Sequence, residues 1–511
     1  MQTSEFSKNS EVFFFLRAPC FLCTIVPMSL LSKFKDDPLL GKVIRSSGAL
    51  FSSNTISLGL SMVQSILAAR LLGPADFGLV AIITSYATTV NGFLSFRMSE
   101  LVVRYGGEYL EKDEKEKTAA LVKAAALSEA TVSLLAFFVV ALTATLASKY
   151  IAKTPNTAPF FIVYSLGLLA NFNTETSTGV LQMLGKIKYQ GAVNLVQSLL
   201  TAGMITFAFF TKGSLQFVLT AYLASKVVLG LGIFSTAFFH LTKKLGGGWW
   251  RMSLRGAFSA TTLPGTARQG KCAPHASAGE QSPANLEIAS GEVHRPRNDM
   301  NFRELFKFAF TSNLSATAIL VFRESEILWV GYFLTSEAAG YYKAAYAIVS
   351  LLSVPANPFI LTTYPEINKL VVQKSWSRLK DFLKKITTVA AAYNLALAAV
   401  FIIFGKWLLS IYGAQYTAAY PALIALLVGF TFNYTLFWNR PLLLSLGLPE
   451  FPLKATVIAG VAKLALAFPL VPRFGYVAEA ALLSLYYITS VGAIVLRGVK
   501  EVRQNENRSH H

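Results

Sequence analysis

Charged residues, cysteine and nucleotide-binding motifs are scarce in this chain of 511 residues. Only 14% of the residues are charged, fewer than a soluble protein of this length normally carries. Zinc would need two more ligands near the Cys20–Cys23 pair, and the only other cysteine is Cys272, so neither a zinc site nor a disulfide framework is expected. No GxxxxGK[ST], HExxH or GxSxG motif occurs, which argues against a P-loop ATPase and the corresponding protease and hydrolase classes.

Long apolar segments dominate instead, since 53% of the residues are hydrophobic. Runs of about 20 apolar residues recur along nearly the whole chain, and an α-helix of this length crosses the hydrocarbon core of a bilayer. We therefore predict an all-α integral membrane protein. Its twelve predicted spans lie near residues 47–71, 79–96, 124–148, 158–181, 191–210, 216–239, 305–332, 342–367, 386–405, 420–443, 454–472 and 476–496.

The basic residues indicate how these spans are oriented. The chain has 46 Lys and Arg against 27 Asp and Glu, which gives a net charge of +19. When the loops are assigned to alternate sides, most Lys and Arg fall on the side of both termini, and this bias marks the cytoplasm. We therefore expect cytoplasmic termini. A nucleic-acid partner is not expected, because the charge follows the loops rather than a patch on a soluble domain.

The composition divides the chain into two halves. Residues 241–302 are rich in Gly, Ser, Ala, Pro and Arg and lack apolar periodicity, so a largely disordered cytoplasmic linker is predicted. Residues 1–27 fit poorly with the rest, and we expect translation to start at Met28, which opens an amphipathic stretch. The predicted parts are a cytoplasmic N-terminal segment at 1–46, an N-lobe at 47–240, the linker, a C-lobe at 303–498 and a cytoplasmic tail at 499–511.

A short polar hairpin, "LLGPADFGLVAI" at residues 71–82, separates the first two spans. Gly73 and Pro74 end the first span, because proline cannot continue a helix and glycine tolerates left-handed backbone angles. Asp76 can cap the next helix, and Gly78 permits a close approach of two backbones. We predict a tight hairpin on the outer side of the membrane.

The hairpin returns in the second half as "FLTSEAAGYYKA" at 333–344, where Gly340 aligns with Gly78. A second motif, "LQMLGKIKY", returns as "LLLSLGLPEF" and aligns Gly185 with Gly447. Both pairs are 262 residues apart (340 − 78 and 447 − 185), which indicates a duplication. Six spans in each half give the two copies the same orientation, so the predicted repeat is parallel.

Four segments carry a resemblance to a known family: "ARLLGPADFGLVA" after the first span, "VVRYGGEYL" (102–110), "LQMLGKIKYQGAVNLVQSLL" (181–200) and "EILWVGYFLTSEAAGYYKAAYAI" (326–348). They resemble the polysaccharide and oligosaccharide-lipid exporters, the Wzx-type flippases, of the multidrug/oligosaccharidyl-lipid/polysaccharide exporter superfamily. The resemblance covers roughly residues 45–497. Two features depart from it, namely Thr335-Ser336 in place of Gly-Pro in the second repeat and the long linker.

The resemblance implies a MATE-like fold of two six-helix lobes around a central cavity. Proteins of this family flip undecaprenyl-pyrophosphate-linked sugars from the cytoplasmic to the outer leaflet, and they are not ATPases. The implied partners are lipid-linked oligosaccharide and membrane lipids, with a polysaccharide polymerase and glycosyltransferases as further candidates. No cofactor is expected, and the expected location is the bacterial cytoplasmic (inner) membrane.

Ionisable residues inside spans are costly and usually face a cavity or a partner. In the seventh span, Arg323 and Glu326 share a helix face, whereas Glu324 points about 100° away. One interpretation is an Arg323–Glu326 pair that neutralises itself. The other puts Arg323 on pyrophosphate or an acidic sugar and lets Glu326 or Glu324 take up a coupling proton or Na⁺. Subtracting 262 from Glu326 gives Gln64, so both lobes are polar at this position.

The remaining candidates are weaker. Lys226 lies near mid-span and could face a cavity, and Lys463 is similar, whereas Arg440 is close enough to the inner boundary to extend into water. Asn54 and Asn171 could hydrogen-bond a sugar together with Gln64, or they could join helices to one another.

The leading hypothesis is a secondary transporter that flips lipid-linked oligosaccharide for exopolysaccharide, capsule or O-antigen synthesis by alternating access, and not an enzyme. The alternative within transporters is a cation-coupled multidrug extruder. An integral-membrane polysaccharide polymerase or ligase is a third option. It is disfavoured because the longest predicted outer loop, around residues 406–419, is short for holding catalytic groups.

Overall fold

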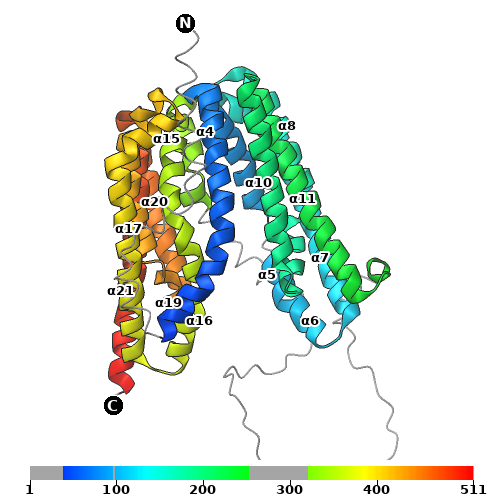
Figure 1. Cartoon of the computed structure of the whole chain (residues 1–511), viewed down its shortest axis with the longest axis vertical. Helices are drawn as coiled ribbons and strands as arrows, with labels where there is room; N and C mark the ends of the chain where they lie inside the picture. The colour runs from blue at the N-terminus through cyan, green and yellow to red at the C-terminus, as the bar shows by residue number, and fades with distance from the viewer. Residues whose placement is uncertain (1–37, 96–97, 253–319, 510–511) are drawn as a thin grey trace, which may run out of the picture.

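The computed structural model describes residues 38–95, 98–252 and 320–509, and every secondary-structure element in these ranges is a helix (Figure 1). In chain order the elements are α4 (Pro38–Leu94), α5 (Met98–Leu101), η2 (Val102–Gly106), α6 (Gly107–Glu111), α7 (Lys115–Leu146), η3 (Ala147–Ile151), η4 (Pro155–Thr157), α8 (Ala158–Ala170), α9 (Thr174–Met183), α10 (Ile187–Phe210), α11 (Leu215–Leu245), η5 (Trp249–Arg251), η6 (Leu320–Glu324), α14 (Glu326–Phe333), α15 (Ser336–Val349), η7 (Ser350–Leu352), α16 (Ser353–Val372), α17 (Trp376–Tyr412), η8 (Ala414–Ala419), α18 (Tyr420–Thr435), α19 (Asn439–Ser445), α20 (Glu450–Phe474) and α21 (Tyr476–Ser509). The predicted all-α membrane fold is confirmed.

Eight helical segments of the described chain are long and apolar enough to cross a membrane. The first of them, in α4, contains two predicted spans that join at Gly73, where φ is 73° and ψ is 176°. Four other predicted spans are divided into shorter pieces: α8 with α9, η6 with α14, α15 with η7 and α16, and α18 with α19. Residues 305–319 of the predicted seventh span lie outside the described residues, so the described helices account for the other predicted spans and for the end of this one.

The break between α8 and α9 shows how a divided span is held. Asn171 follows α8, donates from Nδ2 to the carbonyl of Gly167 (2.9 Å) and accepts from Thr174 Oγ1 (3.1 Å), so its amide serves the helix end. Gly230 of α11 packs on this break, where an added Cβ would lie 2.2 Å from the carbonyl oxygen of Ala170. Only glycine allows this approach.

Helix ends differ from the predicted domain boundaries at three places. α4 begins at Pro38, α11 continues to Leu245, and α21 continues to Ser509 through most of the predicted tail. Lys, Arg and Glu along the last turns of α21 lie beyond the apolar stretch, and a helix continues past a membrane boundary where its polar side chains reach water. Residues 1–37 and 253–302, which include Met28 and most of the predicted linker, lie outside the described residues.

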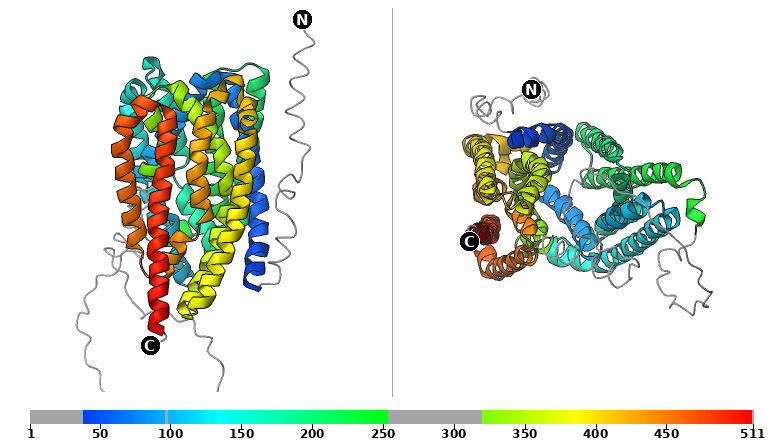
Figure 2. Two further views of the ribbon diagram at one scale, coloured as in Figure 1. Left: turned by 90° about the vertical axis from the view of Figure 1, so that its left-hand side faces the viewer. Right: turned by 90° about the horizontal axis from the view of Figure 1, so that it is seen from below.

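The two halves correspond at one spacing along their whole length. Besides the two glycine pairs found in the motifs, three further pairs are 262 residues apart: Gly167 with Gly429, Gly213 with Gly475, and Gly230 with Gly492. The helices follow the same spacing, since α18 begins 262 residues after α8, and α21 begins 261 residues after α11. Figure 2 shows the helices of the two halves as two groups when the bundle is seen along its axis.

The two hairpins pack directly against each other where the lobes meet. A Cβ added to Gly78 would lie 1.7 Å from the carbonyl oxygen of Ser336, and one added to Gly340 would lie 2.1 Å from that of Pro74. The paired motifs of the repeat thus form a reciprocal contact between lobes at the end of the bundle opposite the C-terminus (Figure 1). We call this the outer end, following the predicted orientation.

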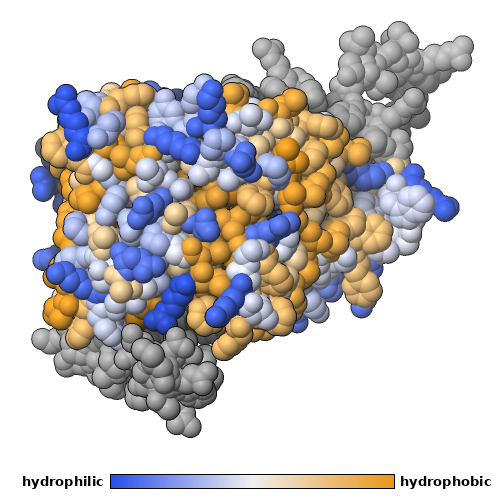
Figure 3. Space-filling model, turned by 90° about the horizontal axis from the view of Figure 1, so that it is seen from above, coloured by the Kyte–Doolittle hydropathy of each residue, from blue (hydrophilic) through white to orange (hydrophobic). Residues whose placement is uncertain are grey.

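The bundle exposes apolar side chains along its flanks, as a membrane protein does. Leu142 and Leu496 are 80% and 74% exposed, although they lie in long apolar helices. Figure 3 looks onto the outer end, where hydrophilic residues are interspersed with hydrophobic ones, as at a membrane–water boundary.

Candidate functional site

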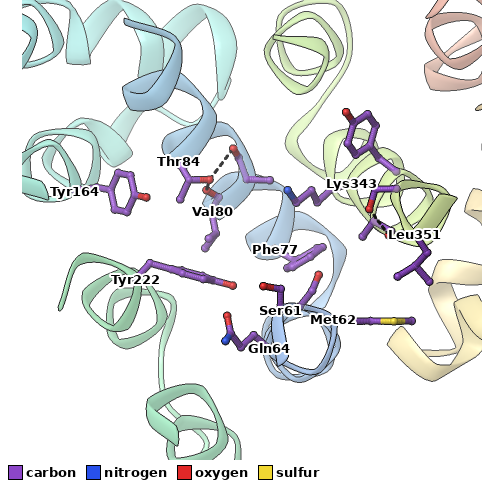
Figure 4. Close-up of a pocket in the computed structure, with 15 residues that line it drawn as sticks. Ser61, Met62, Gln64, Phe77, Val80, Thr84, Tyr164, Tyr222, Lys343 and Leu351 are labelled. Atoms are coloured by element: carbon purple, nitrogen blue, oxygen red, sulfur yellow. Dashed lines mark hydrogen bonds between the residues drawn. The ribbon is translucent and has the colours of Figure 1, made fainter. Parts of the chain in front are cut away.

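A pocket of about 350 Å³ lies between the two lobes (Figure 4). The N-lobe contributes α4, α8 and α11, and the C-lobe contributes α15 and η7. Hydroxyl, amide and aromatic groups dominate the lining, which consists of Ser61, Met62, Gln64, Ser65, Phe77, Val80, Ala81, Thr84, Tyr164, Tyr222, Lys343, Tyr346, Ala347, Ser350 and Leu351. A concave site with a few polar groups among apolar and aromatic ones is typical of small-molecule binding.

Lys343 is the charged residue of this lining. It lies on α15 three residues after Gly340, so the contact between the hairpins fixes the start of the helix that carries it. Figure 4 shows its side chain extending from α15 toward Val80 and Thr84 of α4. The sequence places Lys343 at the edge of a span and did not identify it as a binding residue. Its position just after the second hairpin was the available signal.

Gln64 lines the same pocket, where the structure brings it together with Lys343. Its Nε2 donates to the carbonyl oxygen of Ser198 on α10 at 2.8 Å, which fixes the amide although it is almost fully buried. Tyr222 of α11 points toward it, and Tyr164 of α8 lies on the side of Val80 and Thr84 (Figure 4).

Lys226 lies behind the pocket rather than in its lining. Its ammonium is 5.4 Å from the centroid of the Tyr164 ring, and that ring lines the pocket. A cation against an aromatic face is stabilised without a carboxylate partner. Lys226 therefore contacts a residue of the lining without lining the pocket itself.

Arg323 and Glu326 do not pair with each other as one interpretation of the sequence had it. Residues 320–324 form a turn of π-helix, and its wider winding turns Arg323 away from the face expected of an α-helix. Arg323 lies instead 3.6 Å from the exposed Glu324 carboxylate, measured from Nε, and 5.6 Å from the centroid of the Tyr487 ring. Its Nε is buried and has no hydrogen-bond partner.

Glu326 belongs to a buried ion cluster with Lys463 of α20 and Glu479 of α21. The Lys463 ammonium pairs with the Glu326 carboxylate and lies 3.0 Å from Glu479 Oε1. The three side chains are 3%, 1% and 0% exposed for Glu326, Lys463 and Glu479, respectively. Tyr342 of α15 donates its hydroxyl to Glu326 Oε2 at 2.9 Å, so four helices of the C-lobe meet at this cluster.

Sequence reasoning considered Lys463 only as a weak candidate and missed Glu479. Glu479 is the fourth residue of α21, so the pattern placed it near a span end where a carboxylate can reach water. The available signal was an acidic residue within the apolar run "YVAEAALL".

Two further predicted residues lie apart from the pocket. Arg440 is exposed near the start of α19, and Asn171 serves the end of α8. Asn54 lies on α4, but its side chain is outside the described residues. Within the described part of the chain, no group of three His, Cys, Asp or Glu side chains is arranged to hold a metal ion.

Comparison with known proteins decides the family. The family model described as "Polysaccharide biosynthesis protein" matches residues 43–259 and 291–371, which is more than half of the chain. The chain belongs to this family. A segment of 75 residues is 35% identical to the inner membrane protein YghQ of Escherichia coli (strain K12), covering 15% of this chain and 21% of that protein. This chain therefore aligns with about a fifth of its curated relative.

Solved structures share the fold at low sequence identity. An inward-facing multidrug resistance MATE family transporter of the MOP superfamily superposes with a TM-score of 0.64 and 15% identity, over 88% of this chain and 96% of that one. The lipid II flippase MurJ, in an inward closed conformation, superposes with a TM-score of 0.57 and 13% identity over 90% of each chain. The resemblance to the exporter superfamily is thus confirmed, and the chain is a multi-pass membrane protein with the transporter fold of that superfamily.

Proposed function

We propose that this protein is a secondary transporter that flips undecaprenyl-pyrophosphate-linked oligosaccharide across the bacterial cytoplasmic membrane, for exopolysaccharide, capsule or O-antigen synthesis. The observation that carries the proposal is the pocket between the lobes, which combines one ammonium with tyrosine rings, hydroxyls and an amide. Its substrate crosses the membrane without chemical conversion.

The groups of the pocket fit the two ends of the polar head. The Lys343 ammonium suits a phosphate, to which charge-assisted hydrogen bonds are strong. The rings of Tyr164, Tyr222 and Tyr346 offer flat apolar faces with hydroxyl edges, and Gln64 supplies an amide, a combination that suits a sugar ring. A volume of about 350 Å³ accommodates part of an oligosaccharide head, so the pocket is assigned to pyrophosphate and the adjoining sugar.

The packing of the lobes supports loading from the cytoplasm. The hairpins close the outer end through the contacts of Gly78 and Gly340, and in Figure 1 the two groups of helices diverge toward the opposite end. Alternating access then requires the hairpins to separate while the other end closes. We assign Arg323 and Lys226 to the approach of the anionic head toward the pocket, and Arg440 to its first encounter at the cytoplasmic end.

The test is a deletion strain that accumulates lipid-linked oligosaccharide in the inner leaflet. Expression of the wild-type chain should clear the stranded lipid, Lys343→Met should fail to clear it, and Lys343→Arg should restore part of the activity. Lys406→Met is the matched control, because Lys406 is an exposed residue of α17 that does not line the pocket. A Lys343→Met variant that clears the lipid at the wild-type rate would remove the pocket from the proposal.

The same strain distinguishes the multidrug alternative. A drug extruder would change resistance to cationic compounds when it is overexpressed and would leave the lipid-linked saccharide unchanged. The flippase is expected to do the reverse.

A further inference from the structure

Helices α10 and α11 carry basic side chains and no acidic ones. Between Glu175 and Glu280 the chain contains no Asp or Glu, and this stretch includes all of α10, α11 and η5. At the end of the bundle that holds the C-terminus, which is cytoplasmic in the predicted orientation, the ends of these elements carry five basic residues (Figure 1). We call them the basic patch: Lys186, Lys188, Lys243, Lys244 and Arg251.

The described residues provide no counter-charge for the basic patch. None of its five side chains forms an ion pair with another described residue, and four of them are exposed. In a neighbouring segment of the N-lobe, by contrast, Lys112 pairs with Glu108 at 2.7 Å and Lys117 with Glu114 at 3.0 Å. The chain that follows the described part of the N-lobe has its first acidic residue at Glu280. The charge of the basic patch is therefore open to an anionic ligand.

The chain after α11 turns back along the bundle. Gly246 ends the helix with φ at 99°, a backbone angle that glycine adopts without strain. Trp249 then donates from Nε1 to Thr242 Oγ1 of α11 at 2.9 Å, and the Lys123 ammonium of α7 donates to the carbonyl oxygen of Met252. Because Lys123 lies eight residues after the start of α7 (123 − 115), this contact is about 12 Å along that helix. The η5 turn is thus held against the N-lobe and does not extend away from it.

This turn presents an aromatic ring and a cation at the flank of the N-lobe. Trp249 is only 6% exposed, whereas Trp250 is 52% exposed, and the Arg251 guanidinium carbon lies 4.7 Å from the centroid of the Trp250 ring. In Figure 1 the green turn after α11 extends sideways from the bundle and does not reach as far down as α6, and Figure 2 places it at the edge of the bundle seen from below. Tryptophan rings with a polar edge are typical of the headgroup level of a membrane.

The neighbouring helix ends have the same arrangement of rings and cations. Phe239 of α11 is 64% exposed and lies one turn before Lys243. Tyr189 of α10 is also exposed, follows Lys188 directly, and has its ring centroid 4.5 Å from that of His240 on α11. An acidic soluble protein would match the charge but would not explain exposed rings that continue the apolar flank. Aromatic rings followed by Lys and Arg match instead the boundary between acyl chains and headgroups.

We propose that the basic patch, together with Trp250 and Tyr189, binds the headgroups of anionic phospholipids and anchors the flank of the N-lobe at the membrane surface. Phosphate oxygens accept charge-assisted hydrogen bonds from ammonium and guanidinium groups, and the net negative charge of an anionic headgroup balances cations that have no carboxylate partner. The basic patch shares no residue with the lining of the pocket between the lobes, so the inference does not rest on the proposed function.

The test follows the fluorescence of Trp250 in phosphatidylcholine vesicles that contain the purified full-length protein and a small fraction of brominated lipid. Bromine quenches a tryptophan that it contacts, and the difference between the wild type and Trp250→Phe isolates the signal of this residue. Brominated phosphatidylglycerol should quench that signal at a lower mole fraction than brominated phosphatidylcholine. This preference should weaken as sodium chloride is added, because salt screens exposed charges.

Neutralising the basic patch should remove the preference. A basic residue near an anionic surface contributes about fivefold to binding, so replacing four of them should lower the preference for phosphatidylglycerol at least about tenfold. The substituted side chains are exposed, and the fold should therefore be retained. The matched control, which removes two paired lysines of the same lobe, should keep the wild-type preference. The test variant combines Lys188→Gln, Lys243→Gln, Lys244→Gln and Arg251→Gln, and the control combines Lys112→Gln with Lys117→Gln.

Each contrary result overturns the proposal. Equal quenching of Trp250 by the two brominated lipids would exclude a preference for anionic headgroups, and no quenching by either would show that the turn does not contact lipid. An unchanged preference in the test variant would assign the preference to other basic residues. Quenching that appears only when acidic residues of the following segment are neutralised would make that segment the occupant of the basic patch; this variant combines Glu280→Gln, Glu287→Gln, Glu292→Gln and Asp299→Asn. None of these measurements needs transport, so failure of the lipid-clearance assay would leave this inference standing.

Discussion

The two lobes have equivalent helix arrangements, but their buried side chains differ in charge. Positions 262 residues before Glu326, Lys463 and Glu479 are Gln64, Thr201 and Phe217. Where the C-lobe holds an ion cluster, the N-lobe therefore holds an amide, a hydroxyl and a ring at equivalent helix positions. Gly78 and Gly340, at the contact between the hairpins, are kept at equivalent positions of both lobes. Duplication preserved the packing that brings the helices together, while the ion chemistry belongs to one lobe.

The largest effect should follow from removing the ammonium of the C-lobe. Lys463→Met leaves two buried carboxylates facing each other, and loss of one partner of a buried ionic group costs about 3–5 kcal/mol. Thr201→Val at the equivalent position of the N-lobe removes one hydroxyl bonded to the Gln197 carbonyl and should cost no more than about 1 kcal/mol. Unfolding of both variants in detergent measures the difference.

A compensated variant sharpens this comparison. Lys463→Met combined with Glu326→Gln and Glu479→Gln gives the C-lobe a neutral cluster like that of the N-lobe, and we expect it to recover much of the lost stability. If the triple variant is as unstable as Lys463→Met, packing around the side chain rather than charge accounts for the loss.

The contact between the hairpins should be nearly as sensitive as the ion cluster. An added Cβ at Gly340 would overlap the carbonyl oxygen of Pro74, so Gly340→Ala forces the lobes apart at the outer end and should cost about 1–3 kcal/mol or more. Gly203→Ala is the control, because no atom lies within 4 Å of its added Cβ and alanine favours a helix. Thermal stability and clearance of the stranded lipid are the readouts. Normal values for Gly340→Ala would show that the outer ends do not close on each other.

The divided spans differ between lobes in a smaller way. In the N-lobe, Glu129 of α7 accepts the backbone N–H groups of Glu175 and Thr176 at 2.8 Å each, at the start of α9. In the C-lobe, Trp438, the counterpart of Thr176, donates to Thr387 of α17 at 2.7 Å.

Replacing Glu129, the carboxylate in the N-lobe, should therefore cost more stability than replacing Trp438, the neutral donor in the C-lobe. Glu129→Gln loses one of two acceptors for buried N–H groups and should destabilise by about 1–3 kcal/mol, and Trp438→Phe should lose about 1 kcal/mol for its hydrogen bond beyond the change in packing. Equal losses, measured by unfolding in detergent, would mean that the carboxylate adds nothing beyond a neutral hydrogen bond.

The sequence was sufficient for the architecture because apolar runs and a repeated motif are local patterns. The all-α membrane fold and the 262-residue spacing follow from such patterns. The site required three-dimensional information. Whether Glu326 pairs with Arg323 or Lys463 depends on a turn of π-helix at 320–324 and on a contact 137 residues away, and neither leaves a periodic signal.

The smallest effect is expected on the same helix as the largest. Lys454 and Glu450 of α20 form an ion pair at 2.9 Å, but their side chains are 69% and 80% exposed, so water and salt screen the attraction. Lys454→Met should therefore leave stability and transport unchanged within error. Lys454 lies about two and a half turns before Lys463 on the same helix, and the same substitution at Lys463 should be severely destabilising. Because the residue types, the substitution and the helix are identical, the difference isolates burial as the cause. A measurable loss of stability in Lys454→Met would mean that positive charge along α20 matters whether it is buried or exposed. Burial would then not explain the contrast between the charged interior of the C-lobe and its neutral counterpart in the N-lobe.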